Sequence, residues 1–100
     1  MDKDYEAAVK YINAAIEVNP ENYLYYFRLS KVYWDWNESY RHDKQYCYSL
    51  LLKSARLNPN FSSNYAYLGH FYKNVEKDED RCIKCYKKAV TLNPLEDEAG

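Results

Sequence analysis

The sequence predicts an all-α protein of about five helices, arranged as antiparallel hairpins that stack into an α-solenoid. Three observations lead to this prediction. Apolar residues recur every three or four positions along five segments, which is the periodicity of amphipathic helices. Only 2 glycines and 3 prolines interrupt the 100 residues, so few special turns are expected. All three prolines occur as Asn-Pro, each at the end of a helix-like run.

The expected helices are separated by polar or proline-containing breaks. A polar stretch at residues 37–42 ends the second pattern, and residues 95–100 look like the clipped start of a sixth helix. A proline cannot donate an interior hydrogen bond, so it stops one helix and can open the next. The predicted helices span residues 4–18, 21 to about 36, 43–57, 61–75 and 78–92.

The Asn-Pro pairs divide the chain into similar units. They lie 39 and 35 residues apart, and the runs before them end alike as AAIEVNP, KSARLNP and KAVTLNP. This spacing predicts the second helix of a truncated unit at residues 1–20 and two complete units at 21–59 and 60–94. Residues 95–100 would be the stub of the next helix.

Large and small side chains alternate in one register along these units, so that two antiparallel helices can interlock. This pattern resembles the tetratricopeptide (TPR) repeat, which implies right-handed superhelical stacking and a surface for binding other proteins. Against the 34-residue period of that family, the extra residues of both complete units fall at the turn between helices. The positions that carry the pattern are Ala8, Ile12, Ala15 and Pro20; Tyr26, Leu29, Ser30, Tyr33, Cys47, Leu51, Ser54 and Pro59; and Tyr65, Leu68, Gly69, Tyr72, Cys82, Tyr86, Ala89 and Pro94.

The last third of the chain carries a narrower resemblance. Residues 67–100, through Tyr67-Leu68-Gly69-His70, Cys85-Tyr86 and the closing Glu98-Ala99-Gly100, are similar to the large TPR subunits of superkiller (Ski) complexes. The resemblance implies a fragment of a non-catalytic scaffold that joins a helicase and WD-repeat propeller subunits. Such complexes feed messenger RNA to 3′-to-5′ decay by the cytoplasmic exosome. A generic TPR adaptor of another assembly remains the alternative.

Composition points to protein partners. The formal charge is −1, from 14 basic and 15 acidic side chains, whereas nucleic-acid binders usually carry a net basic balance. The uncharged apolar stretches fall far short of the roughly 20 residues that span a bilayer. Three cysteines without a disulfide framework favour a reducing location, the cytoplasm with the nucleus as an alternative. No direct nucleic-acid contact, membrane or cofactor is expected.

First helices of TPR units line an inner groove, and the register places a partner-binding surface on two of them. The lysine–asparagine–arginine clamp with which some TPR domains hold a chaperone's carboxylate is absent, because Phe27, Ala66 and Tyr67 stand at its positions. The groove would suit an extended segment or a helix with apolar anchors. Its expected residues are Leu24, Phe27, Lys31, Trp34, Asp35, Ser63, Ala66, His70 and Lys73.

A remote alternative is a small metal or redox protein that uses Cys82 and Cys85. A structural zinc site needs four ligands, and the nearby candidates are His42, Cys47 and His70. Cys47 and Cys82 fall on small-residue positions of the repeat, which explains them as packing groups. Neither histidine has a nucleophile at a spacing that suggests catalysis, so no enzyme is expected.

Tyrosine is over-represented, with 13 residues. Exposed aromatic residues at this density commonly mark an interface. For Tyr5 and Tyr11 we expect instead a face left by an absent neighbouring helix. Since repeat arrays need about three units and polar caps, the 100-residue chain should be marginally stable or self-associate.

Overall fold

The computed structural model describes residues 4–36 and 44–92. The expected break at 37–42, Pro94 and the expected helix start at 95–100 lie outside these residues. The chain divides into two compact units, Met1–Leu57 and Asn58–Gly100, which are described in turn. The division into repeat units at residues 1–20, 21–59, 60–94 and 95–100 stays a prediction.

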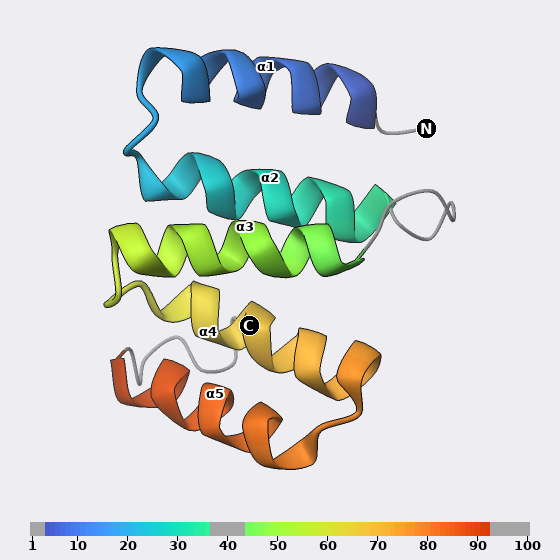
Figure 1. Cartoon of the computed structure of the whole chain (residues 1–100), viewed down its shortest axis with the longest axis vertical. Helices are drawn as coiled ribbons and strands as arrows, with labels where there is room; N and C mark the ends of the chain where they lie inside the picture. Colours follow the sequence, from blue (N-terminus) through green and yellow to red (C-terminus); the bar gives the residue numbers. More distant parts are fainter. Residues whose placement is uncertain (1–3, 37–43, 93–100) are drawn as a thin grey trace. The chain divides into compact units, whose positions relative to one another are not determined.

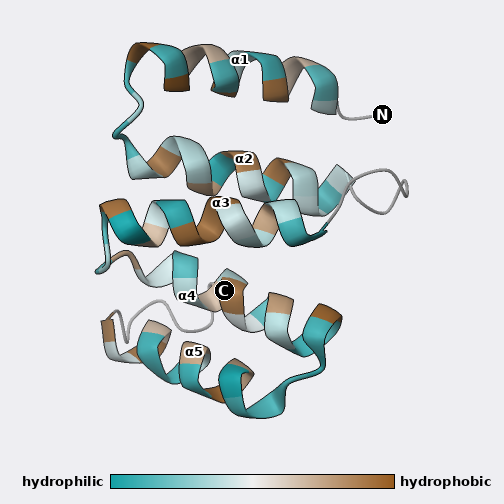
Figure 2. Cartoon of the chain, in the orientation of Figure 1, coloured by the Kyte–Doolittle hydropathy of each residue, from teal (hydrophilic) through white to brown (hydrophobic). Residues whose placement is uncertain are grey.

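The first unit contains three helices, α1 (Tyr5–Val18), α2 (Tyr23–Trp36) and α3 (Lys44–Leu57). Successive helices run antiparallel, with α2 between α1 and α3 (Figure 1). Figure 2 shows hydrophobic and hydrophilic stretches alternating along each of them, as the sequence periodicity predicts.

Short polar side chains fix where these helices begin. Asp4 is the N-cap of α1, where its Oδ1 accepts a hydrogen bond of 3.0 Å from the Ala7 N–H. The Asn22 Oδ1 accepts from the Leu24 N–H at 2.9 Å, and the Asn22 N–H bonds back to the Asn19 carbonyl at 3.3 Å. Because Pro20 lies in this turn, α2 begins two residues later than the sequence pattern predicts.

The core of the first unit lies between α2 and α3. Leu29, Cys47 and Leu51 each keep only 1% of their surface exposed. Two buried serines are satisfied by carbonyl groups: the Ser30 hydroxyl donates to Phe27 O at 2.8 Å, and the Ser54 hydroxyl donates to Tyr23 O at 2.9 Å. The second of these bonds ties α3 to the start of α2.

The second unit is a hairpin with an irregular first helix. α4 (Ser62–Phe71) continues into a π-helical turn, η2 (Tyr72–Glu76), and α5 (Glu79–Leu92) returns against it. The prediction of one regular helix over 61–75 is therefore wrong in its last turn. The turn ends at Lys77, whose left-handed φ of 56° directs its N–H and that of Asp78 to the Tyr72 carbonyl.

The core of this hairpin gathers Leu68, Phe71 and Cys82, with exposures of 5%, 1% and 5%. Gly69 and Asn64 are buried as well. Both amide atoms of Asn64 lack a hydrogen-bond partner among the described residues. At the start of α5 the Asp78 carboxylate accepts from the Arg81 N–H at 3.2 Å.

Both complete hairpins carry the same pair of contacts on the tyrosine that opens the repeat pattern. The Tyr26 hydroxyl donates to Pro20 O at 2.6 Å, and the Tyr65 hydroxyl donates to Pro59 O at 2.8 Å. A lysine of the second helix lies beside each ring, with Lys53 Nζ 5.7 Å from the Tyr26 centroid and Lys88 Nζ 5.3 Å from that of Tyr65. The sequence repeat is therefore also a repeat of three-dimensional contacts.

Within the described residues, no helix combines the length and the apolar character needed to cross a membrane.

Candidate protein-interaction surfaces

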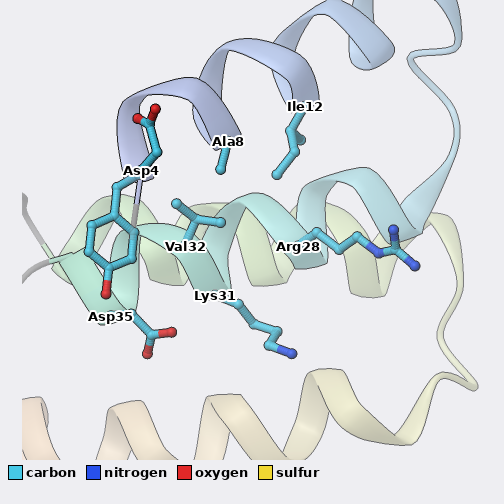
Figure 3. A pocket seen from close by; sticks show the side chains of 8 residues that line it. Asp4, Ala8, Ile12, Arg28, Lys31, Val32 and Asp35 are labelled. Atoms are coloured by element: carbon cyan, nitrogen blue, oxygen red, sulfur yellow. The ribbon is translucent and has the colours of Figure 1, made fainter. Parts of the chain in front are cut away.

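A groove of about 510 Å³ runs between α1 and α2. Its floor is apolar, because Ala8 and Ile12 point from α1 toward α2 while Val32 points back toward α1 (Figure 3). Charged side chains of both signs stand around this floor. The residues that line the groove are Asp4, Tyr5, Ala8, Ile12, Arg28, Lys31, Val32 and Asp35.

The structure separates the expected partner-contact residues of α2 into two groups. Lys31 and Asp35 are exposed, and both line this groove. Phe27 is buried, with 7% of its surface exposed, and Lys31 Nζ lies 5.6 Å from its ring centroid. Trp34 is half-buried beneath the Lys44 ammonium, which lies 3.7 Å from the indole and donates to the Trp34 carbonyl at 3.2 Å. Leu24 is half-buried.

On α4, the expected contact residues Ser63, Ala66 and His70 are half-buried, and Lys73 on η2 is exposed. His70 Nδ1 lies 2.6 Å from the Tyr86 hydroxyl of α5, and the Tyr67 ring meets the imidazole edge-on at 5.4 Å. Burial, followed by the Lys73 charge, lowers the pKa of His70. Which of the two side chains donates in this contact depends on the imidazole tautomer.

Gly69 is the residue that lets Tyr86 approach α4. A Cβ at this position would lie 2.5 Å from Tyr86 Cε1 and 2.7 Å from Cδ1, which is too close for any side chain without movement. The small-residue position of the repeat therefore places the Tyr86 ring, and through it the hydrogen bond to His70.

The cysteines lack the setting of a reactive site. Cys82 is buried and Cys85 is half-buried. Burial, and to a smaller extent the electrostatic effect of the neighbouring Cys82, raises the pKa of the Cys85 thiol. A raised pKa disfavours the thiolate that redox chemistry requires. Among residues 4–36 and 44–92, no three His, Cys, Asp or Glu side chains gather as metal ligands would. His42 lies outside the described residues.

An aromatic stack in the first unit was not foreseen from the sequence. Tyr5 stacks on Trp36 at 5.7 Å, Trp36 on Tyr33 at 6.0 Å, and Tyr33 meets Tyr46 edge-on at 5.2 Å. Tyr5 is therefore half-buried against α2 and also lines the groove, and its expected role as the face of an absent neighbouring helix stays a prediction. Tyr11 is 75% exposed. The surplus of aromatic residues was a signal of such packing, but its pairs depend on tertiary structure.

The helical hairpins and their shared register define a repeat protein of the TPR class. The family model of the tetratricopeptide repeat matches residues 2–22 and 63–94, so the chain belongs to the TPR family. The unmatched hairpin of α2 and α3 shows the same tyrosine–proline contact as the matched one.

The relatives that the chain resembles are much longer than the chain itself. Tetratricopeptide repeat protein 37 of Xenopus laevis is 38% identical over 100 residues, which covers 100% of this chain. Superkiller complex protein 3 of Homo sapiens is 37% identical over 98 residues, or 98% of the chain. The chain spans about 6% of the length of these relatives.

Among solved structures, the crystal structure of MamA is similar in fold. Its TM-score is 0.51 at 19% sequence identity, and the match covers 91% of this chain and 70% of that one. The prediction of an all-α TPR fold and the resemblance to the Ski-complex TPR subunit are both confirmed.

Proposed function

We propose that this chain is a segment of a non-catalytic protein-interaction scaffold, the TPR subunit of a cytoplasmic Ski complex that assists exosome-mediated 3′-to-5′ mRNA decay. The observation that carries the proposal is the 37% identity to Superkiller complex protein 3, which extends over 98% of the chain. The proposed partners are the helicase and the WD-repeat subunits of that complex.

The chemistry of the two units favours binding over catalysis. His70, one of the two histidines, has its Nδ1 engaged by the Tyr86 hydroxyl, and burial raises the pKa of the Cys85 thiol, which disfavours its thiolate. Exposed charged groups that could meet a partner stand on first helices of the repeat, at Lys31 and Asp35 and at Lys73. Such mixed surfaces are typical of repeat proteins that bind other chains.

Co-purification with identification of the bound subunits tests the proposal. The natural polypeptide that contains this segment carries an affinity tag and is isolated from its own cells under mild conditions. We expect a helicase and a WD-repeat protein in stoichiometric amounts. A stable assembly that lacks both would instead identify a TPR adaptor of another complex, since the repeat itself is shared by proteins of different assemblies.

A further inference from the structure

On the basis of the scaffold role proposed above, we propose that one face of α5 binds an acidic segment of a partner protein, whichever complex the scaffold serves. This surface, the basic face of α5, consists of Arg81, Lys84, Lys87 and Lys88. Its cations are exposed, and neither the stability of the helix nor the packing of the repeat accounts for the two central lysines.

The four basic side chains gather on one side of the helix. Arg81, Lys84 and Lys88 follow one another at intervals of three and four residues, so they lie in one row, and Lys87 stands beside them. All four side chains are exposed. The basic face is about 10 Å long, because each residue between Arg81 and Lys88 adds about 1.5 Å to the helix.

The two central lysines have no partner within the described part of the chain. Arg81 lies 3.5 Å from the Asp78 carboxylate, and the Lys88 ammonium lies beside a tyrosine ring of α4. In contrast, Lys84 and Lys87 make no ion pair, hydrogen bond or ring contact with another described residue. Their ammonium groups are therefore available to carboxylates of another chain.

The stability of α5 does not explain these lysines. Like charges three or four residues apart weaken a helix, and Lys84 has Lys87 and Lys88 at these distances. Neither Lys87 nor Lys88 has an acidic residue three or four positions away. Cations stabilise the last turn of a helix through its dipole, but the last turn of α5 holds no basic residue. The cluster therefore costs helix stability, which indicates a role in binding.

The packing of the repeat does not require these charges either. In the register that the two complete hairpins share, Lys84 and Lys87 correspond to Ser49 and Leu52 of α3. Both residues of α3 are exposed as well, so an uncharged side chain is compatible with these positions. The two lysines are therefore a specific feature of α5.

Charge complementarity indicates an acidic protein segment as the occupant, because opposite charges select partners across an interface. The exposed Glu76, Glu79 and Asp80 precede the basic face, so the partner must confine its negative charge to a few adjacent positions. A polypeptide with a short cluster of aspartate or glutamate does this. RNA carries a charge at every phosphate and would also meet these acidic groups, and its affinity depends on many phosphate contacts.

Zero-length crosslinking of the isolated natural assembly tests the proposal. The carbodiimide EDC joins a lysine amine to a carboxylate in direct contact with it, and mass spectrometry identifies both peptides. We expect Lys84 or Lys87 to link to an aspartate or glutamate of another protein. The control is Lys10, which is exposed and occupies the register position of Lys84 on α1.

Several outcomes of the crosslinking would overturn the proposal. They are links of Lys84 and Lys87 only within the same chain or to a second copy, no more links than at Lys10, and ultraviolet-induced links of the basic face to RNA in place of a protein. Partner subunits that co-purify without touching these lysines would refute this surface alone. An assembly without the helicase and WD-repeat subunits, in which the lysines still link to another protein, would refute only the proposed function.

Charge reversal gives a second readout with the subunit that the links identify. The variant Lys84→Glu/Lys87→Glu should stay folded, because a glutamate four residues before Lys88 forms a favourable pair. The natural polypeptide with these changes should bind that subunit at least about tenfold more weakly, and the difference should shrink at high salt because exposed charges are screened. Lys10→Glu should bind as the wild type does. Unchanged affinity of the double variant would overturn the proposal.

Discussion

At the residue scale, the hairpin of the second unit depends on the contact between Gly69 and Tyr86. The glycine is needed for space, since nothing larger than its hydrogen fits beneath the tyrosine ring. The hairpin of the first unit places Ser30 and Leu51 at the same two positions, and both are buried. The two hairpins thus use different pairs at these positions: the smallest residue, Gly69, faces the large Tyr86, whereas the larger Ser30 is paired with the smaller Leu51.

A substitution series tests this pairing. Gly69→Ala should reduce the free energy of unfolding by about 1–3 kcal/mol, as overpacking does, because the Cβ displaces the Tyr86 ring. Adding Tyr86→Leu, which copies the pairing in the first unit, should recover part of the loss. Urea denaturation measures both, with Ser63→Ala as the matched control on the same helix. Full stability of Gly69→Ala would contradict the packing account.

The tyrosine–proline bonds make a second prediction. Tyr26→Phe and Tyr65→Phe each remove one hydroxyl that donates to a proline carbonyl. Each should cost about 0.5–1.5 kcal/mol, the usual net value of a hydrogen bond. Tyr11→Phe is the control, since that ring is largely exposed. Differential scanning calorimetry should show two losses of similar size; a loss in one unit without the other would contradict their equivalence.

His70 should make stability depend on pH. Burial and Lys73 lower its pKa in the folded chain below the ordinary value of 6.5. The unfolded chain therefore binds the proton more readily, and stability falls as pH drops from about 6.5 through the lowered pKa. Subtracting the profile of His70→Gln from that of the wild type isolates this effect. A difference that does not change between pH 7 and pH 5 would contradict it.

At the element scale, the end of the first helix in the second unit is set by its backbone. After α4 the helix continues as the π-helical turn η2 and ends at Lys77, which has the left-handed backbone conformation. Glycine adopts this conformation without penalty, whereas lysine does not. Lys77→Gly should therefore raise the free energy of unfolding by about 0.5–1 kcal/mol, measured by thermal unfolding. Lys73→Gly, inside η2, should lower it by about 1 kcal/mol, so equal effects would contradict the assigned turn.

The periodicity of apolar residues was sufficient to predict the five helices of the described residues, with bounds correct to within two residues at most ends. The π-helical turn could not be predicted in this way, because Tyr72 and Val75 fit a regular helical pattern equally well. The position of Phe27 illustrates the same limit for the candidate surface. A helical register places it beside Lys31, but tertiary packing decides that the ring is buried while the ammonium is exposed.

At the scale of the whole molecule, repetition explains both the fold and its open faces. The same contacts recur in two hairpins, and Ala8 and Ile12 of α1 line a groove. The sequence predicts this arrangement because Asn-Pro and the small-residue positions keep one register. It cannot supply the pairings of Tyr5 with Trp36 or of His70 with Tyr86, which depend on how neighbouring helices meet.

The central claim is that exposed groups on the first helices of these repeats bind other subunits. Isothermal titration calorimetry of the natural polypeptide with the purified helicase and WD-repeat subunits proposed as its partners tests this claim most directly. If the surfaces on α2 and η2 contact the partners, the Lys31→Glu/Lys73→Glu variant should bind at least about tenfold more weakly, or about 1.4 kcal/mol. The Tyr11→Ser control should bind as the wild type does. Unchanged affinity of the charge-reversal variant, with its fold intact by circular dichroism, would contradict the account.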